Sequence, residues 1–324
     1  MRRREVITLL GGAAAAWPRV ARAQVTGRTY RIGGLHQSPR NAPHHVAFYA
    51  ELERQGIVEG KNLTVDPLGY GLPAEQFAVH AQQLLRDDVD VILCGGDAAG
   101  REAQQLTTAT PIVVLADDMI RAGLVPSLAQ PGGNITGVSI LATELDGKRQ
   151  DILMEAVPGV RHIAALGDVN TTTEAQLRAL RDAARARGIE LSINQVSSRD
   201  DIAPAIDAAK RLGAQALNVL ASALLFNNRE IVLQRVAALR LPAIYQWPEI
   251  ADHEGLLGYG PRIVHIYRDI IARQVIKVLR GTSPAVIPVE QPTKFEFVVN
   301  LRAAKTIGHE VPAGLVLRAD TVVE

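Results

Sequence analysis

The chain has 324 residues, of which 47% are hydrophobic and 21% charged, and its 35 basic and 34 acidic side chains leave a net charge of +1. This length allows two domains with sizeable cores, and the balanced charge argues against a nucleic-acid or membrane-surface partner. The single cysteine, Cys94, excludes an internal disulfide and a cysteine-based zinc site, and its apolar surroundings predict an inert core residue.

The first residues have the pattern of a secretory signal peptide. Arg2-Arg3-Arg4 is a basic start, residues 6–17 are largely apolar, and Ala21-Arg22-Ala23 has the A-x-A form of a cleavage site. The apolar run is too short for a membrane-spanning helix, as is every later run. The adjacent arginines favour a twin-arginine signal, and the Sec route stays open. We expect cleavage after Ala23 and a mature chain free in the periplasm, with no lipid anchor and no membrane insertion.

A first series of strands and helices runs from Tyr30 to Ser139. Short apolar runs between glycines, prolines and polar turns predict buried parallel strands, with amphipathic helices between them. The predicted strands are 30–35, 62–65, 89–94, 110–115 and 135–139, and the predicted helices are 43–55, 74–85, 98–107 and 123–128. Two neighbouring strands end in the turns Gly95-Gly96-Asp97 and Asp117-Asp118. Since ligands of open α/β sheets bind outside the carboxyl ends of the strands, these turns are the first candidate site.

A second series begins near Ile140, after the sharp turn Pro131-Gly132-Gly133-Asn134. The spacing from Thr171 to Glu174 is that of a capping box and predicts the start of one of its helices. The predicted strands are 162–166, 191–196, 216–220, 242–245, 255–260 and 294–300, and the predicted helices are 145–157, 171–187, 198–212, 224–240, 261–279 and 303–307.

The repeated alternation predicts an α/β protein with two doubly wound, Rossmann-like lobes. The late strand and long helix predict that the chain returns to the first lobe, giving a multi-crossing hinge with a cleft between the lobes. We expect lobe I to contain residues 24–138 plus about 256–290, and lobe II to contain residues 139–255 plus about 291–324.

Several motifs have a simpler interpretation than chemistry. The glycines from Gly95 to Gly100 resemble a dinucleotide-binding turn, but Asp97 would place a carboxylate where a pyrophosphate needs bare backbone. Asp97 can instead cap the helix that begins at Ala98, contact a ligand, or do both. Asp117 and Asp118 point in opposite directions at a strand end, so one faces the cleft rather than both forming an acid–base pair. The sequence contains no nucleophile elbow, phosphate loop or zinc-protease motif, so we expect neither an enzyme nor a bound cofactor or metal.

The candidate ligand contacts are polar or small residues that end a predicted strand or begin the next helix. They are His36, Gln37, Ser38, Gly96, Asp97, Asp117, Ser139, Asn170, Thr171, Ser222, Tyr245 and Tyr259. The two tyrosines offer an apolar face and a hydroxyl, with core or hinge packing as the alternative. Asp97 and Asp117 should open toward one cleft and predict an amine-bearing ligand such as an amino acid. Asn170, Thr171 and Ser222 would then bind its other end, which we expect to be a carboxylate at a helix N-terminus.

Five stretches carry a resemblance to a known family: residues 52–62, 123–137, 241–245, 258–261 and 289–296. The most specific are Pro131-Gly132-Gly133-Asn134 and Gln291-Pro292-Thr293-Lys294-Phe295. The chain resembles the solute-binding proteins of ABC transporters, in the type I periplasmic-binding superfamily and in the branch with tryptophan- and phenylalanine-binding members. The resemblance covers essentially the whole chain, including the leader.

The resemblance implies a periplasmic protein, expected to be a monomer, that captures a small molecule between its lobes. It would deliver this ligand to an ABC permease in the inner membrane and catalyse no reaction. The alternative is a secreted ligand-sensing domain for a membrane receptor. Many relatives have an aromatic residue and Asn-Pro where this chain has Gly167-Asp168-Val169-Asn170, and Ser-Asp-Pro where it has Ala221-Ser222-Ala223. Because both segments face the cleft, the relatives' ligand does not transfer directly.

Overall fold

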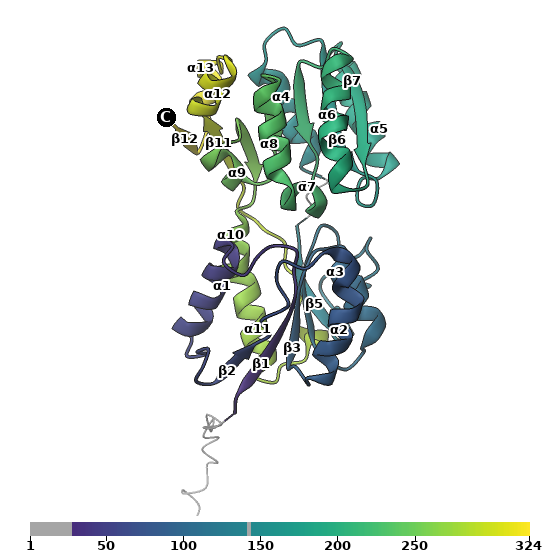
Figure 1. Ribbon diagram of the computed structural model, residues 1–324, viewed down its shortest axis with the longest axis vertical. Helices are drawn as coiled ribbons and strands as arrows, with labels where there is room; N and C mark the ends of the chain where they lie inside the picture. Colours follow the sequence, from purple (N-terminus) through teal and green to yellow (C-terminus); the bar gives the residue numbers. More distant parts are fainter. Residues whose placement is uncertain (1–27, 141–143) are drawn as a thin grey trace, which may run out of the picture.

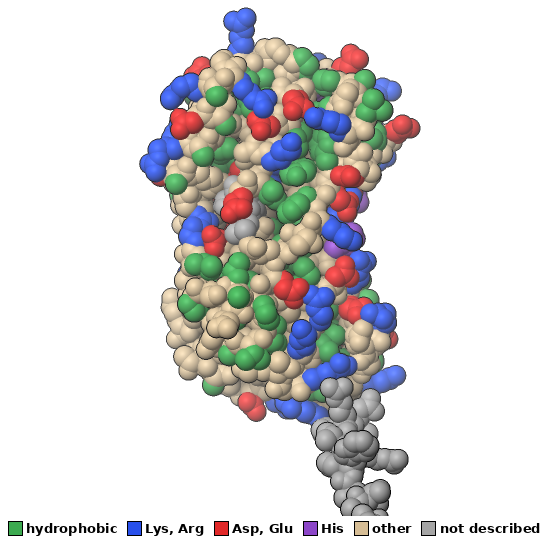
Figure 2. Space-filling model, turned by 180° about the vertical axis from the view of Figure 1, so that it is seen from behind, with side chains coloured by type: hydrophobic (Ala, Val, Ile, Leu, Met, Phe, Trp, Pro, Cys, Tyr) green, Lys and Arg blue, Asp and Glu red, His purple; other side chains and the backbone are tan. Residues whose placement is uncertain are grey.

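The computed structural model describes residues 28–140 and 144–324, which form two α/β lobes joined by a narrow waist (Figure 1). The predicted signal peptide lies outside the described residues. On the face shown in Figure 2, basic and acidic side chains are interspersed over both lobes rather than gathered by sign.

The sheet of lobe I has five parallel strands in the order β2-β1-β3-β4-β5. They are β1 (Tyr30–Leu35), β2 (Leu63–Val65), β3 (Val91–Gly95), β4 (Ile112–Ala116) and β5 (Ile135–Ser139). Both faces of the sheet are covered, so consecutive side chains enter different cores. On β3, Leu93 packs in the cluster that contains Phe48 of α1, whereas Ile92 and Cys94 pack in the cluster that contains Leu84 of α2.

The helices of lobe I come from two distant parts of the chain. The early ones are α1 (Pro43–Arg54), η1 (Ala74–Gln76), α2 (Phe77–Arg86) and α3 (Asp97–Leu106). The late ones are α10 (Ile263–His265), the π-helical η3 (Ile266–Ile271), α11 (Ala272–Leu279) and the short η4 (Pro284–Val286). The long late helix lies beside α1 in Figure 1, and Tyr267 packs in the same cluster as Phe48.

The predicted helix over residues 123–128 is wrong, because this segment forms turns. Gly123 has a φ of +72°, which is outside the helical region. Pro126 lacks the N–H that a helix of this length would need and disfavours helical backbone at the residue before it.

Lobe II is built on a seven-stranded sheet in the order β12-β11-β10-β9-β8-β6-β7, in which only the β10–β11 pair is antiparallel. Its strands are β6 (His162–Asp168), β7 (Glu190–Val196), β8 (Ala216–Val219), β9 (Ala243–Tyr245), β10 (Leu257–Gly260), β11 (Glu296–Asn300) and β12 (Thr321–Val323). Its helices are α4 (Asp146–Ala156), α5 (Glu174–Ala186), η2 (Arg199–Asp201), α6 (Ile202–Arg211), α7 (Ala223–Asn227), α8 (Arg229–Ala238), α9 (Pro248–His253), α12 (Leu301–Ile307) and α13 (Ala313–Val316).

Two local predictions in lobe II need correction. Helix α5 begins after Thr173, whose hydroxyl accepts from the N–H of Gln176 in a capping box, so the Thr171–Glu174 pair is not the cap. Strand β10 pairs with β9 and β11, so residues 257–260 belong to the second sheet. The returning segment of lobe I, expected at about 256–290, therefore begins only after β10. A strand this late can extend the sheet of lobe II because β9 leaves an open edge for it.

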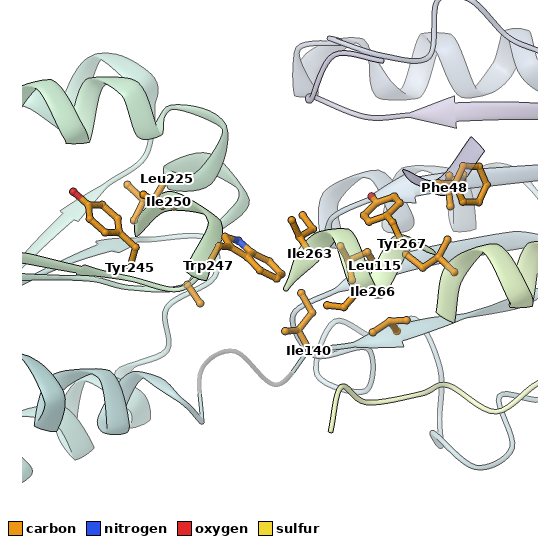
Figure 3. Close-up of a cluster of buried hydrophobic side chains, with 14 of the residues drawn as sticks. Phe48, Leu115, Ile140, Leu225, Tyr245, Trp247, Ile250, Ile263, Ile266 and Tyr267 are labelled. Carbon is orange, nitrogen blue, oxygen red and sulfur yellow. The ribbon is translucent and has the colours of Figure 1, made fainter. Parts of the chain in front are cut away.

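The chain passes between the lobes three times, after β5, after β10 and before β11. The third passage is fixed to β5, because the N–H of Glu290 donates to the carbonyl of Gly137 (3.0 Å) and its carbonyl accepts from the N–H of Ser139 (2.9 Å). One hydrophobic cluster continues through the waist from Tyr245 and Trp247 to Ile263 and Ile140 (Figure 3). The two lobes are therefore joined by apolar packing as well as by the chain itself.

Candidate functional site

The carboxyl ends of the strands in the two sheets face each other across the waist, where the described residues of the two lobes make several contacts. The Cα of Gly96 lies opposite Ala223, so that a methyl group on Gly96 would be 3.6 Å from the Ala223 Cβ. The side chain of Asn227 bonds to Gln37 and Ser38 at 2.8 and 2.9 Å. These contacts describe a closed arrangement of the lobes.

A further contact is made by Arg121, which follows β4 in lobe I. Its Nη1 donates to the carbonyl oxygen of Thr171 in lobe II at 3.1 Å. The turn that holds Arg121 is ordered by Asp118, whose Oδ1 accepts from the N–H groups of Ile120 and Arg121 at 3.1 and 3.0 Å. The Asp118 carboxylate is therefore engaged within its own turn.

Asp97 and Asp117 lie together at the ends of neighbouring strands. The Oδ1 of Asp97 accepts from the N–H of Asp117 at 2.9 Å. Asp97 is thus not the cap of α3: the N-cap is Gly96, with a φ of +118°, and Asp97 occupies the first helical position. Its carboxylate is oriented by the adjacent strand, because the N–H at the end of β4 needs an acceptor that the sheet does not supply.

The charge of this pair is poorly compensated. Burial and the neighbouring carboxylates of Asp97 and Asp146 raise the pKa of Asp117 to about 7, although Arg121 and Arg149 act in the opposite direction. Burial also raises the pKa of Asp97. In the described residues no hydrogen bond reaches the Asp117 carboxylate. A cation placed here would relieve this unfavourable charge.

Another carboxylate, that of Asp146, is paired within its own lobe, although burial raises its pKa. It is buried with Arg149, which forms an ion pair with it and donates to the carbonyl of Tyr259 at 3.1 Å. The amide of Gln176 also donates to Asp146. This arrangement joins the start of α4 to the end of β10, next to two of the hinge passages.

The lobe II candidates are mostly engaged in bonds within their own lobe. The Ser222 hydroxyl donates to Asp168 Oδ2 at 2.8 Å and accepts from the N–H of Leu225 at 3.3 Å, so it caps α7. Asp168 Oδ1 accepts from the N–H of Asn170 (2.9 Å), whose side chain is exposed. The buried Thr171 hydroxyl has no hydrogen-bond partner among the described residues.

An aromatic group lines the same interface on the side of β1. In lobe I, His36 stacks on Tyr70 with ring centroids 5.1 Å apart, and His45 lies edge-on to His36 at 4.6 Å. His44 reaches Phe226 of lobe II at 6.4 Å, and Phe226 lies edge-on to Trp247 at 5.8 Å. We call these six residues the aromatic seam.

The histidines of the seam are neutral near pH 7. Burial, and then the neighbouring ring of His45, lowers the pKa of His44 to about 3, while burial lowers that of His45 to about 4. Burial also lowers the pKa of His36, whose Nε2 has no hydrogen-bond partner among the described residues. An uncharged seam can pack against an apolar ring, and the His36 nitrogen can add a polar contact.

Three predicted site residues are placed elsewhere. Tyr245 is buried in the core of lobe II with its hydroxyl turned away from lobe I (Figure 3). The ring of Tyr259 packs in the lobe II cluster of Ile152 and Leu257. Ser139 is fully buried, and its hydroxyl accepts from the N–H of Met119 at 3.2 Å. The side chains at these positions stabilise the lobes and the hinge.

The structure also brings to the interface residues that the sequence did not suggest. Four such residues lie at or near it: Arg121, Phe226, Asn227 and Trp247. Of these, only Trp247 lies close to the end of a predicted strand, two residues after β9. Phe226 and Asn227 end the short helix α7, a place for which local sequence gives no signal. A search for aromatic and amide residues shortly after strand ends would have found Trp247.

The chemistry available at the interface is that of binding. Among the described residues, no group of three His, Cys, Asp or Glu side chains could hold a metal ion. A small cavity of about 10 Å³ lies beneath α7, lined by Leu225, Phe226, Tyr245 and Trp247 among others. It is about the size of one water. In the described part of the chain, the helices are too short or too polar to cross a membrane.

Comparison with known proteins agrees with this picture. The sequence matches the family described as "ABC transporter substrate binding protein" over residues 46–323. A curated relative, the "Tyrosine-binding protein" of Clostridioides difficile (strain R20291), is 25% identical over 286 residues, covering 85% of this chain and 79% of the relative.

Two solved structures share the fold. One is an ABC domain in complex with L-Trp from Streptococcus pneumonia, with a TM-score of 0.80 and 20% identity over 91% of this chain and 100% of that chain. The other is the ligand-free, open structure of a substrate-binding protein with adhesive properties from Clostridium difficile, with a TM-score of 0.60 and 20% identity over 91% and 99%. The architecture is that of the type I periplasmic binding proteins, and the chain belongs to the family of ABC transporter substrate-binding proteins, which bind small molecules and are not enzymes.

Proposed function

We propose that this protein binds an amino acid with an aromatic side chain between its lobes. The observation that carries the proposal is the carboxylate of Asp117, which lies beside Asp97 with too little positive charge around it. An ammonium group is the ligand feature that would compensate it, in a charge-assisted hydrogen bond. A carboxylate left uncompensated in a closing cleft would oppose closure, so the ligand's amine would itself favour the closed form.

The ring of the ligand would lie toward the aromatic seam. His36 directly follows β1, and Asp117 directly follows β4, two strands away in the order β1-β3-β4. Strands are roughly 4.8 Å apart, so about 10 Å separates these two strand ends. This span suits a ligand with an amine at one end and a ring at the other. The tyrosine-binding relative and the L-Trp complex are consistent with such a ligand.

The ligand carboxylate would be bound near Arg121 and the Thr171 hydroxyl, with the N–H groups of the first turn of α3 as further donors. Gln37, Ser38, Gly96 and Asn170 would line the cleft mouth. Ser222 contributes by fixing the turn after β8, because its hydroxyl is engaged by Asp168.

We further propose that the protein acts in the periplasm and delivers its ligand to an ABC permease. Substrate-binding proteins of ABC transporters are typically extracytoplasmic, which supports this location. Deletion of the gene should abolish uptake of the ligand, and a permease and an ATPase should be encoded nearby. Normal uptake in the deletion strain would contradict this role.

Calorimetry can test the ligand class. We expect binding of L-tyrosine or L-tryptophan, and much weaker binding of the corresponding arylpropionates, which lack the amine. Asp117→Asn should weaken amino-acid binding by roughly 2–5 kcal/mol, because a buried charge partner is lost. Asp118→Asn is the matched control, since its remaining oxygen can still accept from the turn N–H groups, and it should bind like the parent. If arylpropionates bind as well as the amino acids, Asp117 does not hold an ammonium group.

A further inference from the structure

The contact between Asn227 and lobe I is made entirely by protein atoms. The Nδ2 of Asn227 donates to Gln37 Oε1 at 2.8 Å, and the Ser38 hydroxyl donates to Asn227 Oδ1 at 2.9 Å. Both ends of one amide are therefore used, and all three side chains are half-buried. Gln37 and Ser38 follow β1 in lobe I, whereas Asn227 ends α7 in lobe II.

The position of α7 makes this contact sensitive to the lobe arrangement. The helix follows β8 at the carboxyl edge of the second sheet and lies directly over lobe I in Figure 1. Phe226, one residue before Asn227, meets His44 of lobe I with ring centroids 6.4 Å apart. A hinge rotation that separates the lobes moves α7 away from β1, so both hydrogen bonds and the ring contact are lost together.

We propose that Asn227 is a positioning residue that sets the equilibrium between the open and closed forms. Its two hydrogen bonds exist only in the closed arrangement and involve no ligand atom, so they stabilise closure whichever ligand is bound. A protein that closes more readily binds every ligand more tightly, since the apparent dissociation constant depends on the population of the competent form. Asn227 thereby affects affinity without touching the ligand.

The size of the effect follows from the two bonds. Each neutral hydrogen bond makes a small net contribution, because water replaces it when the lobes open. Loss of both should raise the ratio of open to closed protein roughly tenfold. The neighbouring Asn228 provides a matched control, because its amide donates to Leu224 within the same lobe at 2.9 Å.

The distance between the lobes can be measured directly by double electron–electron resonance between two spin labels. Labels would be attached through Val79→Cys in lobe I and Leu212→Cys in lobe II, two side chains that are each 69% exposed. Cys94 is fully buried and its thiol pKa is raised by burial, so it can remain. The measurement uses purified protein without added ligand, and circular dichroism verifies that each variant is folded.

We expect Asn227→Ala to shift the distance distribution toward longer distances, and Asn228→Ala to leave it as in the parent. Ser38→Ala, which removes one bond from the lobe I side, should give an intermediate shift and serves if Asn227→Ala does not fold. An Asn227→Ala distribution identical to that of the parent would overturn the proposal. Equal shifts in the two asparagine variants would overturn it too, because they would show a general effect on α7.

Discussion

Asp117 is expected to reduce the stability of the ligand-free protein, although it is the residue proposed to bind the ligand's ammonium group. Its carboxylate is half-buried, lies beside Asp97, and has a pKa of about 7 against an ordinary value of 3.8. Asp117→Asn keeps the shape of the side chain and removes the charge. We therefore predict that this variant is more stable than the parent protein in the absence of ligand.

The magnitude and its pH dependence follow from the shifted pKa. Between pH 3.8 and 7 the folded protein retains a proton on Asp117 that the unfolded chain releases, so the free energy of unfolding falls as pH rises through this range. Above pH 7 the destabilisation by Asp117 is complete. The difference between pKa values of 3.8 and about 7 sets its upper limit at roughly 4 kcal/mol, since one pKa unit corresponds to about 1.36 kcal/mol. Because opening of the cleft hydrates the carboxylate, the expected effect is smaller than this limit. We expect Asp117→Asn to raise the free energy of unfolding by about 2 kcal/mol and the Tm by roughly 5 °C.

Urea and thermal denaturation of the ligand-free protein at pH 4.5 and pH 8 test this reasoning. The variant and the parent should be similar at pH 4.5, and the variant should be more stable at pH 8. Asp118→Asn, the neighbouring substitution, should show no such gain at pH 8. A variant that is less stable than the parent at pH 8, or a difference that does not change with pH, would refute the idea that Asp117 is destabilised by burial and by its acidic neighbours.

Three further predictions concern other parts of the chain. Arg149→Met should reduce the free energy of unfolding by about 3–5 kcal/mol in urea denaturation, because it leaves the buried Asp146 without its ion-pair partner. Gly137→Ala should reduce the free energy of unfolding by at least about 3 kcal/mol, because Gly137 has a φ of +147° and a Cβ there would clash with the Val114 carbonyl. Gly133→Ala is the control, since there is open space around Gly133, and it should have the Tm of the parent. N-terminal sequencing of periplasmic protein should begin at Gln24, and a cytoplasmic protein that retains Met1 would contradict the predicted export.

The strands were the most predictable feature, because buried parallel strands leave continuous apolar runs bounded by turns. The run at 89–94 corresponds to β3 (Val91–Gly95), and Pro43 begins α1 as expected. The short segment 123–128 could not be predicted correctly from hydrophobicity alone, because its glycine and proline decide the backbone. The π-helical turn of residues 266–271 also has no local signal that we can identify.

The candidate site was predictable only in part. The rule that ligands bind at strand ends placed His36, Asp97 and Asp117 at the interface, but it does not say which way a side chain points. Tyr245 ends β9 and yet faces the core, because alternate residues of a strand face opposite sides. Asn227 was missed because its partners, Gln37 and Ser38, are 190 and 189 residues away in sequence. Such contacts depend on how the lobes meet, which no short segment encodes.

The late helix that covers lobe I affects the order in which the protein can fold. Ile266, Ile271 and Val275 pack in the same cluster as Val113 and Val138, and the ribosome makes them only after five of the seven strands of lobe II, β6 to β10. Until then the five-stranded sheet has an apolar face that α1 covers in part, so the last step of folding must close a very long loop. A chain still being synthesised would therefore expose this apolar surface and need protection by a chaperone. A fragment that ends after β5 should aggregate rather than fold as an independent lobe.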